Sequence, residues 1–186
     1  MLVLASGSPR RRALLESIGI TLEVRPPDID ETPRPGEHPV AYAKRLSATK
    51  AAGVDGWVLA ADTVVHRDGQ IWGKPSGPSD AERMLAELSG GVHLVTTGVC
   101  LGKVGGHVVF SETTRVEFRQ LSAVEIRTYV DTGEPLDKAG GYGIQGLAAG
   151  FVRQIEGSYT NVVGLPLAQV VEHLAELGMP GFGGVQ

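Results

Sequence analysis

A dense basic cluster, Ser8-Pro9-Arg10-Arg11-Arg12, opens a predicted helix close to the N-terminus. Ser8 is a favourable N-cap, and Pro9 suits the first helical position because its missing N–H is not needed there. Arginines in the first turn oppose the helix dipole, at a cost of about 0.3–1 kcal/mol each. A bound polyanion reverses these terms, since free backbone N–H groups and guanidinium groups both bind phosphate. The cluster therefore favours a polyphosphate site over the alternative, a solvated basic helix start.

The helical period separates the three arginines of this cluster. Arg11 falls on the same face as Leu14 and Leu15, one turn closer to the N-terminus. We therefore expect Arg11 to point along a sheet edge and not into bulk water. Arg10 and Arg12 fall on opposite flanks of the helix, and the period does not choose between them.

Asp62 interrupts an apolar run that extends from Trp57 to Val65. Aspartate is a poor strand former and is costly to bury unless it is paired, hydrogen-bonded or bound to a metal. At the end of a strand, such a carboxylate can hold a divalent cation or accept a proton from water. The alternative is a carboxylate that accepts backbone N–H groups in a tight bend. The residues alone leave both interpretations open.

Further charged residues stand at positions from which they can reach a cleft. Lys50 follows Leu46 by one turn on the apolar side of a predicted helix, so its amine either reaches a cleft or simply extends to solvent. The loop that carries Asp28, Asp30 and Glu31 is acidic, and such loops are usually solvated.

Two glycine-rich stretches look like phosphate-binding loops but lack the required context. Lys74 lies in the stretch 69–75, where Pro75 occupies the position at which a P-loop needs Ser or Thr. Residues 141–146 match G-x-G-x-x-G, yet no strand precedes them and no helix follows. The sequence therefore predicts neither a P-loop nor a dinucleotide-binding fingerprint.

Composition limits the class of protein. A length of 186 residues fits one domain, and the formal net charge of −4 disfavours nucleic acid as a partner. Cys100 is the only cysteine, which excludes an internal disulfide and a cysteine-rich metal site. No apolar run approaches the length of a membrane span, and residues 1–5 are too short for a signal peptide. We expect a cytoplasmic protein without a membrane partner.

The pattern of elements predicts an α/β fold with a mixed, twisted sheet and flanking helices. A glycine-dense stretch at 131–150 has no period and predicts a shaped loop, and we expect a flexible tail from about residue 179 to 186. Capping boxes are expected at Ser79/Glu82 and Ser122/Glu125. Predicted strands cover 2–5, 57–65, 94–101, 108–118 and 151–155, and predicted helices cover 8–19, 40–53, 79–89, 122–130 and 166–177.

Several stretches together resemble the Maf nucleotide pyrophosphatases. They span nearly the whole chain in family order, and their co-occurrence is far more specific than any one of them. The stretches are Leu4-Ala-Ser-Gly-Ser-Pro-Arg-Arg11, Ala61-Asp-Thr-Val-Val65, Gly73-Lys-Pro75, Leu88-Ser-Gly90, Glu134-Pro-Leu-Asp-Lys-Ala-Gly140, Tyr142-Gly-Ile-Gln-Gly146, Gly157-Ser-Tyr159 and Val163-Gly-Leu-Pro-Leu167. The resemblance implies hydrolysis of a nucleoside triphosphate between its α and β phosphates, with the help of a divalent metal. It also implies an elongated two-lobed Maf/ITPase-like fold with a cleft between the lobes, and a single domain that spans residues 1–186.

The resemblance also assigns roles to residues. Asp62 accepts the proton of the attacking water, and Glu31 assists it in catalysis and in holding the metal, Mg²⁺ or else Mn²⁺ or Co²⁺. Lys74 is both catalytic and a phosphate ligand. The implied substrate-binding residues are Ser8, Arg10, Arg11, Lys50, Thr63 and Gln145, of which Arg10, Thr63 and Gln145 stand at positions that set base choice. Family members often form homodimers.

The loop Asp137-Lys-Ala-Gly140 with Tyr142-Gly-Ile-Gln145 resembles the branch that acts on dTTP and UTP. The amide of Gln145 can both donate to and accept from a pyrimidine edge, which suits thymine and uracil. Gly141 departs from the alanine usual in that branch. One alternative is a pyrophosphatase for 7-methyl-GTP or another modified nucleotide, although the 7-methyl-GTP branch is expected to lack this loop. Another is a regulatory nucleotide-binding protein linked to septum formation. Normal and modified pyrimidine nucleotides both remain open as substrates.

Overall fold

The computed structural model describes residues 1–179, and its framework is a seven-stranded mixed sheet. The strand order is β2-β1-β3-β5-β6-β7, and β4 pairs with β3. β1 is parallel to β2 and β3, whereas the other pairs are antiparallel. The strands are β1 (Leu2–Leu4), β2 (Leu22–Val24), β3 (Trp57–Arg67), β4 (Gln70–Trp72), β5 (Val92–Lys103), β6 (Gly106–Phe118) and β7 (Val152–Glu156).

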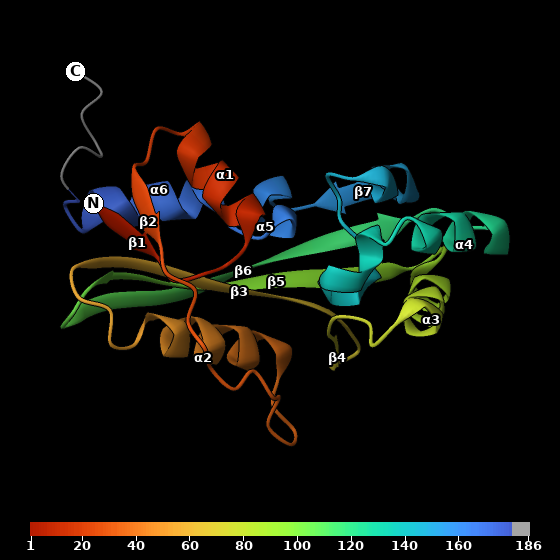
Figure 1. Ribbon diagram of the computed structural model, residues 1–186, viewed down its shortest axis with the longest axis horizontal. Coiled ribbons are helices and arrows are strands. Elements are labelled where there is room, and N and C mark those ends of the chain that lie inside the picture. Colours follow the sequence, from red (N-terminus) through yellow and green to blue (C-terminus); the bar gives the residue numbers. More distant parts are fainter. Residues whose placement is uncertain (180–186) are drawn as a thin grey trace.

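The three long strands β3, β5 and β6 run the length of an elongated molecule (Figure 1). Helices α1, α5 and α6 lie on one side of the sheet, α2 lies on the other, and α3 and α4 stand at the far end (Figure 1). The helices are α1 (Pro9–Ser17), α2 (Pro39–Ala51), α3 (Pro78–Leu88), α4 (Ala123–Asp131), α5 (Tyr159–Val163) and α6 (Leu167–Glu176).

The two largest hydrophobic clusters of the described residues give the molecule two lobes. One core joins β1, β3 and β5 to α1 and α6, through fully buried side chains such as Leu15 and Leu174. The other packs α3, α4 and the segment 139–151 against the far ends of the strands, around Phe118 and Tyr129. Burial of these apolar surfaces is the main favourable term in folding. The expected mixed α/β fold with two lobes is confirmed.

The capping predictions had different outcomes. Arg11 N donates to Ser8 Oγ at 3.4 Å, and both arms of the capping box at Ser122 are present. The box expected at Ser79 is wrong, because Pro78 takes the first helical position and moves the cap to Gly77. Asp80 then accepts a hydrogen bond from Ser76 N instead.

Short elements escaped the sequence analysis. β2, β4 and α5 span only three to five residues, too few to show a period. The glycine-dense stretch contains three 3₁₀ helices, η1 (Glu134–Asp137), η2 (Ala139–Gly141) and η3 (Leu147–Phe151), and the last of these takes Phe151 from the predicted strand. Met179, included in the expected tail, is buried, and residues 180–186 lie outside the described residues. Within residues 1–179, no helix combines the length and the hydrophobicity that crossing a bilayer requires.

Candidate active site

Among residues 1–179, the middle of β3 has no neighbouring strand along one edge, and a cavity of about 960 Å³ opens there. β1 pairs with β3 only at residues 57–59, and β4 pairs with it only at residues 65–67. Between these two pairings, β3 is hydrogen-bonded to β5 on one side, and residues 62–64 line the cavity on the other. Because this edge of β3 is open, side chains from both faces of the sheet reach the same cavity.

Every residue that the sequence analysis placed in the site lines this cavity. The set is Ser8, Arg10, Arg11, Glu31, Lys50, Asp62, Thr63, Lys74 and Gln145. They come from loops, helices and strands in both lobes. Their convergence is a property of the fold, whereas the roles assigned to them in binding and catalysis stay predictions.

Arg11 ties three segments of the chain together at one end of the cavity. Its Nε donates to Gly164 O at 2.8 Å, its Nη1 to Ser6 Oγ at 2.8 Å, and its Nη2 to Thr63 Oγ1 at 3.0 Å. The residue is only 8% exposed, and this burial lowers the pKa of the guanidinium, against the opposing effect of the Asp62 charge. Three of its five N–H groups are thus used within the protein. The prediction that Arg11 points along the sheet edge is confirmed.

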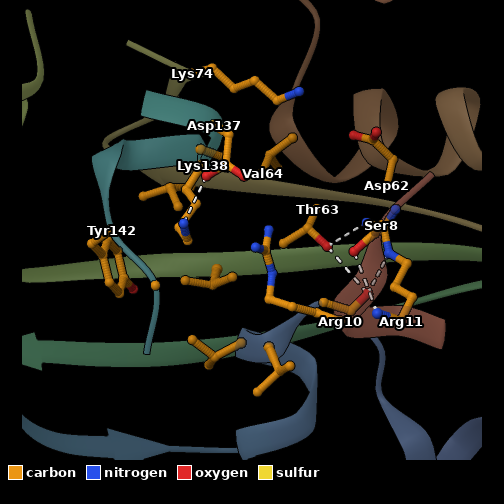
Figure 2. A pocket seen from close by; sticks show the side chains of 18 of the residues that line it. Ser8, Arg10, Arg11, Asp62, Thr63, Val64, Lys74, Asp137, Lys138 and Tyr142 are labelled. Carbon is orange, nitrogen blue, oxygen red and sulfur yellow. Dashed lines mark hydrogen bonds and ion pairs between the residues drawn. The ribbon is translucent and has the colours of Figure 1, made fainter. Parts of the chain in front are cut away.

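The structure also separates Arg10 from Arg12. Arg10 is half-buried and extends into the cavity, as Figure 2 shows. Arg12 is exposed and binds Glu16 one turn further along α1, with Nε to Oε1 at 2.7 Å. Arg10 is therefore the second arginine of the cluster that is available to a ligand in the cavity.

Asp62 forms a buried ion pair with Lys50. Lys50 Nζ lies 2.6 Å from Asp62 Oδ1 and 2.7 Å from Glu31 Oε1. The side chains of Lys50 and Asp62 are 9% and 11% exposed, whereas that of Glu31 is 53% exposed. Removing one partner of such a pair leaves a buried charge without compensation, which is strongly destabilising. One ammonium group therefore holds both predicted acidic residues at the cavity.

The position of Asp62 corrects the sequence analysis. Asp62 does not end a strand or sit in a tight bend; it lies in the middle of β3, opposite Gly98 of β5. A methyl group at Gly98 would come within 2.4 Å of the backbone of Ala43, so α2 approaches the sheet closely only because this residue is glycine. That approach brings Lys50 to Asp62, and it explains how a continuous strand carries a buried carboxylate.

Thr63 points to the opposite face of β3 and joins the Arg11 network. Its Oγ1 lies 2.8 Å from Thr97 Oγ1, in addition to accepting from Arg11. Lys74 lies between β4 and α3, is exposed, and extends over the cavity (Figure 2). We call the part of the cavity lined by Ser8, Arg10, Arg11, Glu31, Lys50, Asp62, Thr63 and Lys74 the charged end.

The other part of the cavity, the loop end, is built by Glu134, Asp137, Lys138, Tyr142 and Gln145. Glu134 accepts hydrogen bonds from Tyr129 Oη at 3.0 Å and from Leu147 N at 3.2 Å. These two bonds close the loop around Gln145, which is itself exposed.

A hydrogen bond to His93 of β5 holds Tyr142, whereas a hydrogen bond from within the loop holds Asp137. Tyr142 Oη lies 2.7 Å from Nε2 of the buried His93 in β5. Burial lowers the pKa of His93 to about 3, so the imidazole is neutral at physiological pH. The hydrogen bond from Lys138 lowers the pKa of Asp137.

The sequence analysis quoted the stretches 134–140 and 142–146 for the family resemblance but assigned a role there to Gln145 alone. It missed the contributions of Glu134, Asp137, Lys138, Tyr142 and His93 to this end of the cavity. The available signal was a set of charged residues within a glycine-dense stretch that has no period. Such a stretch must fold by specific contacts, because no repeating pattern of backbone hydrogen bonds determines it.

The donor set of the charged end fits one class of metal. Within residues 1–179, no three or more His, Cys, Asp or Glu side chains form a group that could enclose a cation. Asp62 and Glu31 nevertheless meet at one point, Lys50 Nζ. Mg²⁺ typically binds one or two carboxylates and takes its remaining ligands from water and substrate phosphates, whereas structural zinc takes four protein ligands. The residues therefore fit a hard divalent cation that arrives with a phosphate ligand.

Known proteins resemble this chain over nearly its whole length. The dTTP/UTP pyrophosphatase of Geobacter sp. (strain M21) is 53% identical, with 97% of each chain covered. The dTTP/UTP pyrophosphatase of Chromobacterium violaceum is 49% identical, with 94% of this chain and 93% of the relative covered. Among solved structures, a HAM1 protein from Coxiella burnetii superposes with a TM-score of 0.52 over 94% of this chain and 98% of that one. At 16% identity, this last likeness shows the fold alone.

A family model provides the assignment. The model described as Maf-like protein matches residues 1–177, which include both ends of the cavity. Given this match and relatives at about half identity, the chain belongs to the Maf family.

Proposed function

We propose that this protein is a nucleoside triphosphate pyrophosphatase that hydrolyses dTTP and UTP to the monophosphate and pyrophosphate. The observation that carries the proposal is a single cavity in which a carboxylate, Asp62, lies among four cationic side chains, Arg10, Arg11, Lys50 and Lys74. The relatives named dTTP/UTP pyrophosphatase support the choice of substrate.

The charged end suits a triphosphate. A chain of three phosphates repels an incoming hydroxide, so its charge must be neutralised before water can attack. Lys50 and Lys74 line the cavity, and Arg11 adds a buried guanidinium whose position is fixed by three hydrogen bonds. The N-terminus of α1, capped by Ser8, adds the positive end of a helix dipole. These groups bind the phosphates and stabilise the charge that develops on the departing pyrophosphate.

Asp62 accepts the proton of the attacking water. Its ion pair with Lys50 fixes the carboxylate at the edge of the cavity, where water can reach it. A positioned general base typically contributes about 10²–10⁴-fold to a rate. Pure binding of a nucleotide needs no such base, which disfavours a regulatory protein without catalysis.

The proposal includes a divalent cation, Mg²⁺ or else Mn²⁺ or Co²⁺, held by Asp62 and Glu31. When bound, such a cation neutralises phosphate charge and lowers the pKa of bound water. Lys50 contacts both carboxylates, so it keeps them close together and limits their mutual repulsion.

Location and assembly complete the proposal. We infer a cytoplasmic enzyme that forms a homodimer and binds neither nucleic acid nor membrane. The net charge of −4 supports the absence of a nucleic-acid partner. Sedimentation analysis tests the homodimer, because a dimer should sediment as a particle with twice the mass of one chain.

A pyrophosphate-release assay in Mg²⁺ across dTTP, UTP, CTP and 7-methyl-GTP tests the function. We expect the highest kcat/KM for dTTP and UTP, and no turnover after chelation of the metal. Asp55→Asn, a change at an exposed aspartate before β3, is the matched control for Asp62→Asn and should leave turnover intact. Preference for 7-methyl-GTP, or nucleotide binding without any turnover, would contradict the proposal.

A further inference from the structure

One ammonium group at the loop end has no role in the chemistry described so far. Lys138 Nζ donates to Glu134 O at 2.6 Å and to Asp137 Oδ1 at 2.7 Å. Its side chain is only 15% exposed, and Figure 2 shows it extending into the cavity near Tyr142. An ammonium has three N–H donors, so one remains for a ligand. The group is a fixed donor in a cavity that holds few others at this end.

Lys138 and Gln145 belong to one compact unit. A methyl group at Gly143 would come within 2.8 Å of Lys138 Cε, so the backbone two residues before Gln145 lies directly on the lysine stem. A methyl group at Gly146 would come within 2.0 Å of Oε1 of Glu134. Glu134 is also the residue whose backbone carbonyl accepts a hydrogen bond from Lys138. Lys138 and the backbone on either side of Gln145 therefore belong to one packed loop, and both residues line the cavity.

Gln145 alone cannot distinguish uracil from cytosine. Uracil and thymine present an acceptor at O4 and a donor at N3, whereas cytosine presents a donor at N4 and an acceptor at N3. A glutamine amide carries one acceptor and one donor group, and rotating it by half a turn exchanges them. It can therefore match either base. An ammonium only donates, and it cannot adapt in this way.

We propose that Lys138 is a specificity-determining residue that donates to the O4 carbonyl of thymine or uracil and opposes the amino group of cytosine. This inference rests on the proposed function, because it assumes a pyrimidine at the loop end. Arg10 is also a donor-only group, is also expected to set base choice, and acts through its charge on Asp137, but it extends from α1, whereas Lys138 belongs to the same loop as Gln145.

Comparison of UTP with CTP tests the proposal, since their bases differ only at position 4 and the adjoining N3. In Lys138→Met, we expect the ratio of kcat/KM for UTP over CTP to fall about tenfold or more, mainly through loss on UTP. Lys138→Gln should lower the ratio as well, because a glutamine amide can rotate to accept from cytosine, whereas Lys138→Arg should retain it. Lys103→Met, at the far tip of β5, is the matched control and should change nothing.

Binding separates this inference from the proposed function. Calorimetry with non-hydrolysable α,β-imido analogues of UTP and CTP gives the same ratio without turnover, so a chain that binds but does not hydrolyse still tests Lys138. A wild-type protein that binds both analogues equally would overturn the inference. The inference would also be overturned if the UTP-over-CTP ratio of Lys138→Met and Lys138→Gln stayed within about twofold of wild type. A fall in this ratio in Arg10→Met alone would overturn it as well. Absence of hydrolysis with a Lys138-dependent preference would instead contradict only the proposed function.

Discussion

The two ends of the cavity are built in different ways. At the charged end, the functional side chains stand on regular elements or next to them: Asp62 in β3, Lys50 in α2 and Arg11 in α1. At the loop end, they stand on 3₁₀ turns joined by glycines with positive φ, such as Gly133 and Gly140. The backbone of the charged end is held by the hydrogen bonds of regular helices and strands, whereas the backbone of the loop end depends on individual side-chain contacts such as Glu134 to Leu147 N.

This difference fits the two tasks. Attack on phosphorus needs charges held in place before the substrate arrives, since reorganising them would raise the barrier. Selection of a nucleobase needs a surface whose residues can be replaced without disturbing the charges that act on phosphorus. Loops on a rigid scaffold provide such a surface. The comparison predicts that changes at the charged end affect turnover or folding, whereas changes at the loop end affect selectivity.

Asp62→Asn should have the largest effect. We expect kcat to fall about 10²–10⁴-fold, because the amide cannot accept the proton of the attacking water. Nucleotide affinity, measured by calorimetry with an α,β-imido analogue, should stay within about fivefold of wild type, since the phosphate-binding cations remain and Glu31 still pairs with Lys50. Near-normal turnover in this variant would remove Asp62 from the mechanism.

Arg11→Lys should reduce both stability and affinity. A lysine cannot replace three directed hydrogen bonds, so buried acceptors lose their donors, at a cost of about 2–4 kcal/mol. Thermal unfolding should show a melting temperature lower by about 5–15 °C, and KM for dTTP should rise. Arg12→Lys is the control, because its exposed ion pair with Glu16 contributes about 0–1 kcal/mol. Equal melting temperatures for the two variants would contradict the structural role of Arg11.

Gln145→Ala should act on selectivity alone. The residue is exposed, so unfolding temperature should not change. Loss of the amide contacts to the base should reduce the preference for dTTP and UTP over purine nucleotides by about tenfold. A nucleotide panel measures this ratio, and unchanged selectivity would show that the loop end does not read the base through this residue.

His93→Gln should affect catalysis least, and its distinguishing effect is on the pH dependence of stability. Folding lowers the pKa of His93 to about 3 from an ordinary value near 6.5. The unfolded chain therefore binds more protons between these values, and stability contributed by the neutral imidazole is lost as pH falls below about 6.5. One such group changes the free energy of unfolding by up to about 1.4 kcal/mol per pH unit.

Chemical denaturation at about pH 7 and about pH 5 checks this prediction. The loss of stability on acidification should be smaller in His93→Gln than in wild type, with the exposed His107→Gln as the control. Burial also lowers the pKa of His66. Its contribution to the loss of stability on acidification is present in wild type, His93→Gln and His107→Gln alike. An identical loss in wild type and His93→Gln would contradict the buried, neutral state of His93.

The contrast between the ends also explains what the sequence could predict. Arg11 was placed correctly because the period of a helix fixes the direction of a side chain, and Ser8 because a cap follows local rules. The register of Asp62 within β3 was not predictable, since it depends on Gly98, a residue distant in sequence that lets α2 approach the sheet. The contacts of Lys138 were equally hidden, because they arise in a loop without a period.

The position of bond cleavage tests the central claim most directly. If the charged end directs water at the α-phosphorus, hydrolysis of dTTP in ¹⁸O-labelled water places the label in the monophosphate, and the other product is unlabelled pyrophosphate. Mass spectrometry of the two products distinguishes the outcomes. Label in pyrophosphate, or release of orthophosphate with a nucleoside diphosphate, would contradict the account.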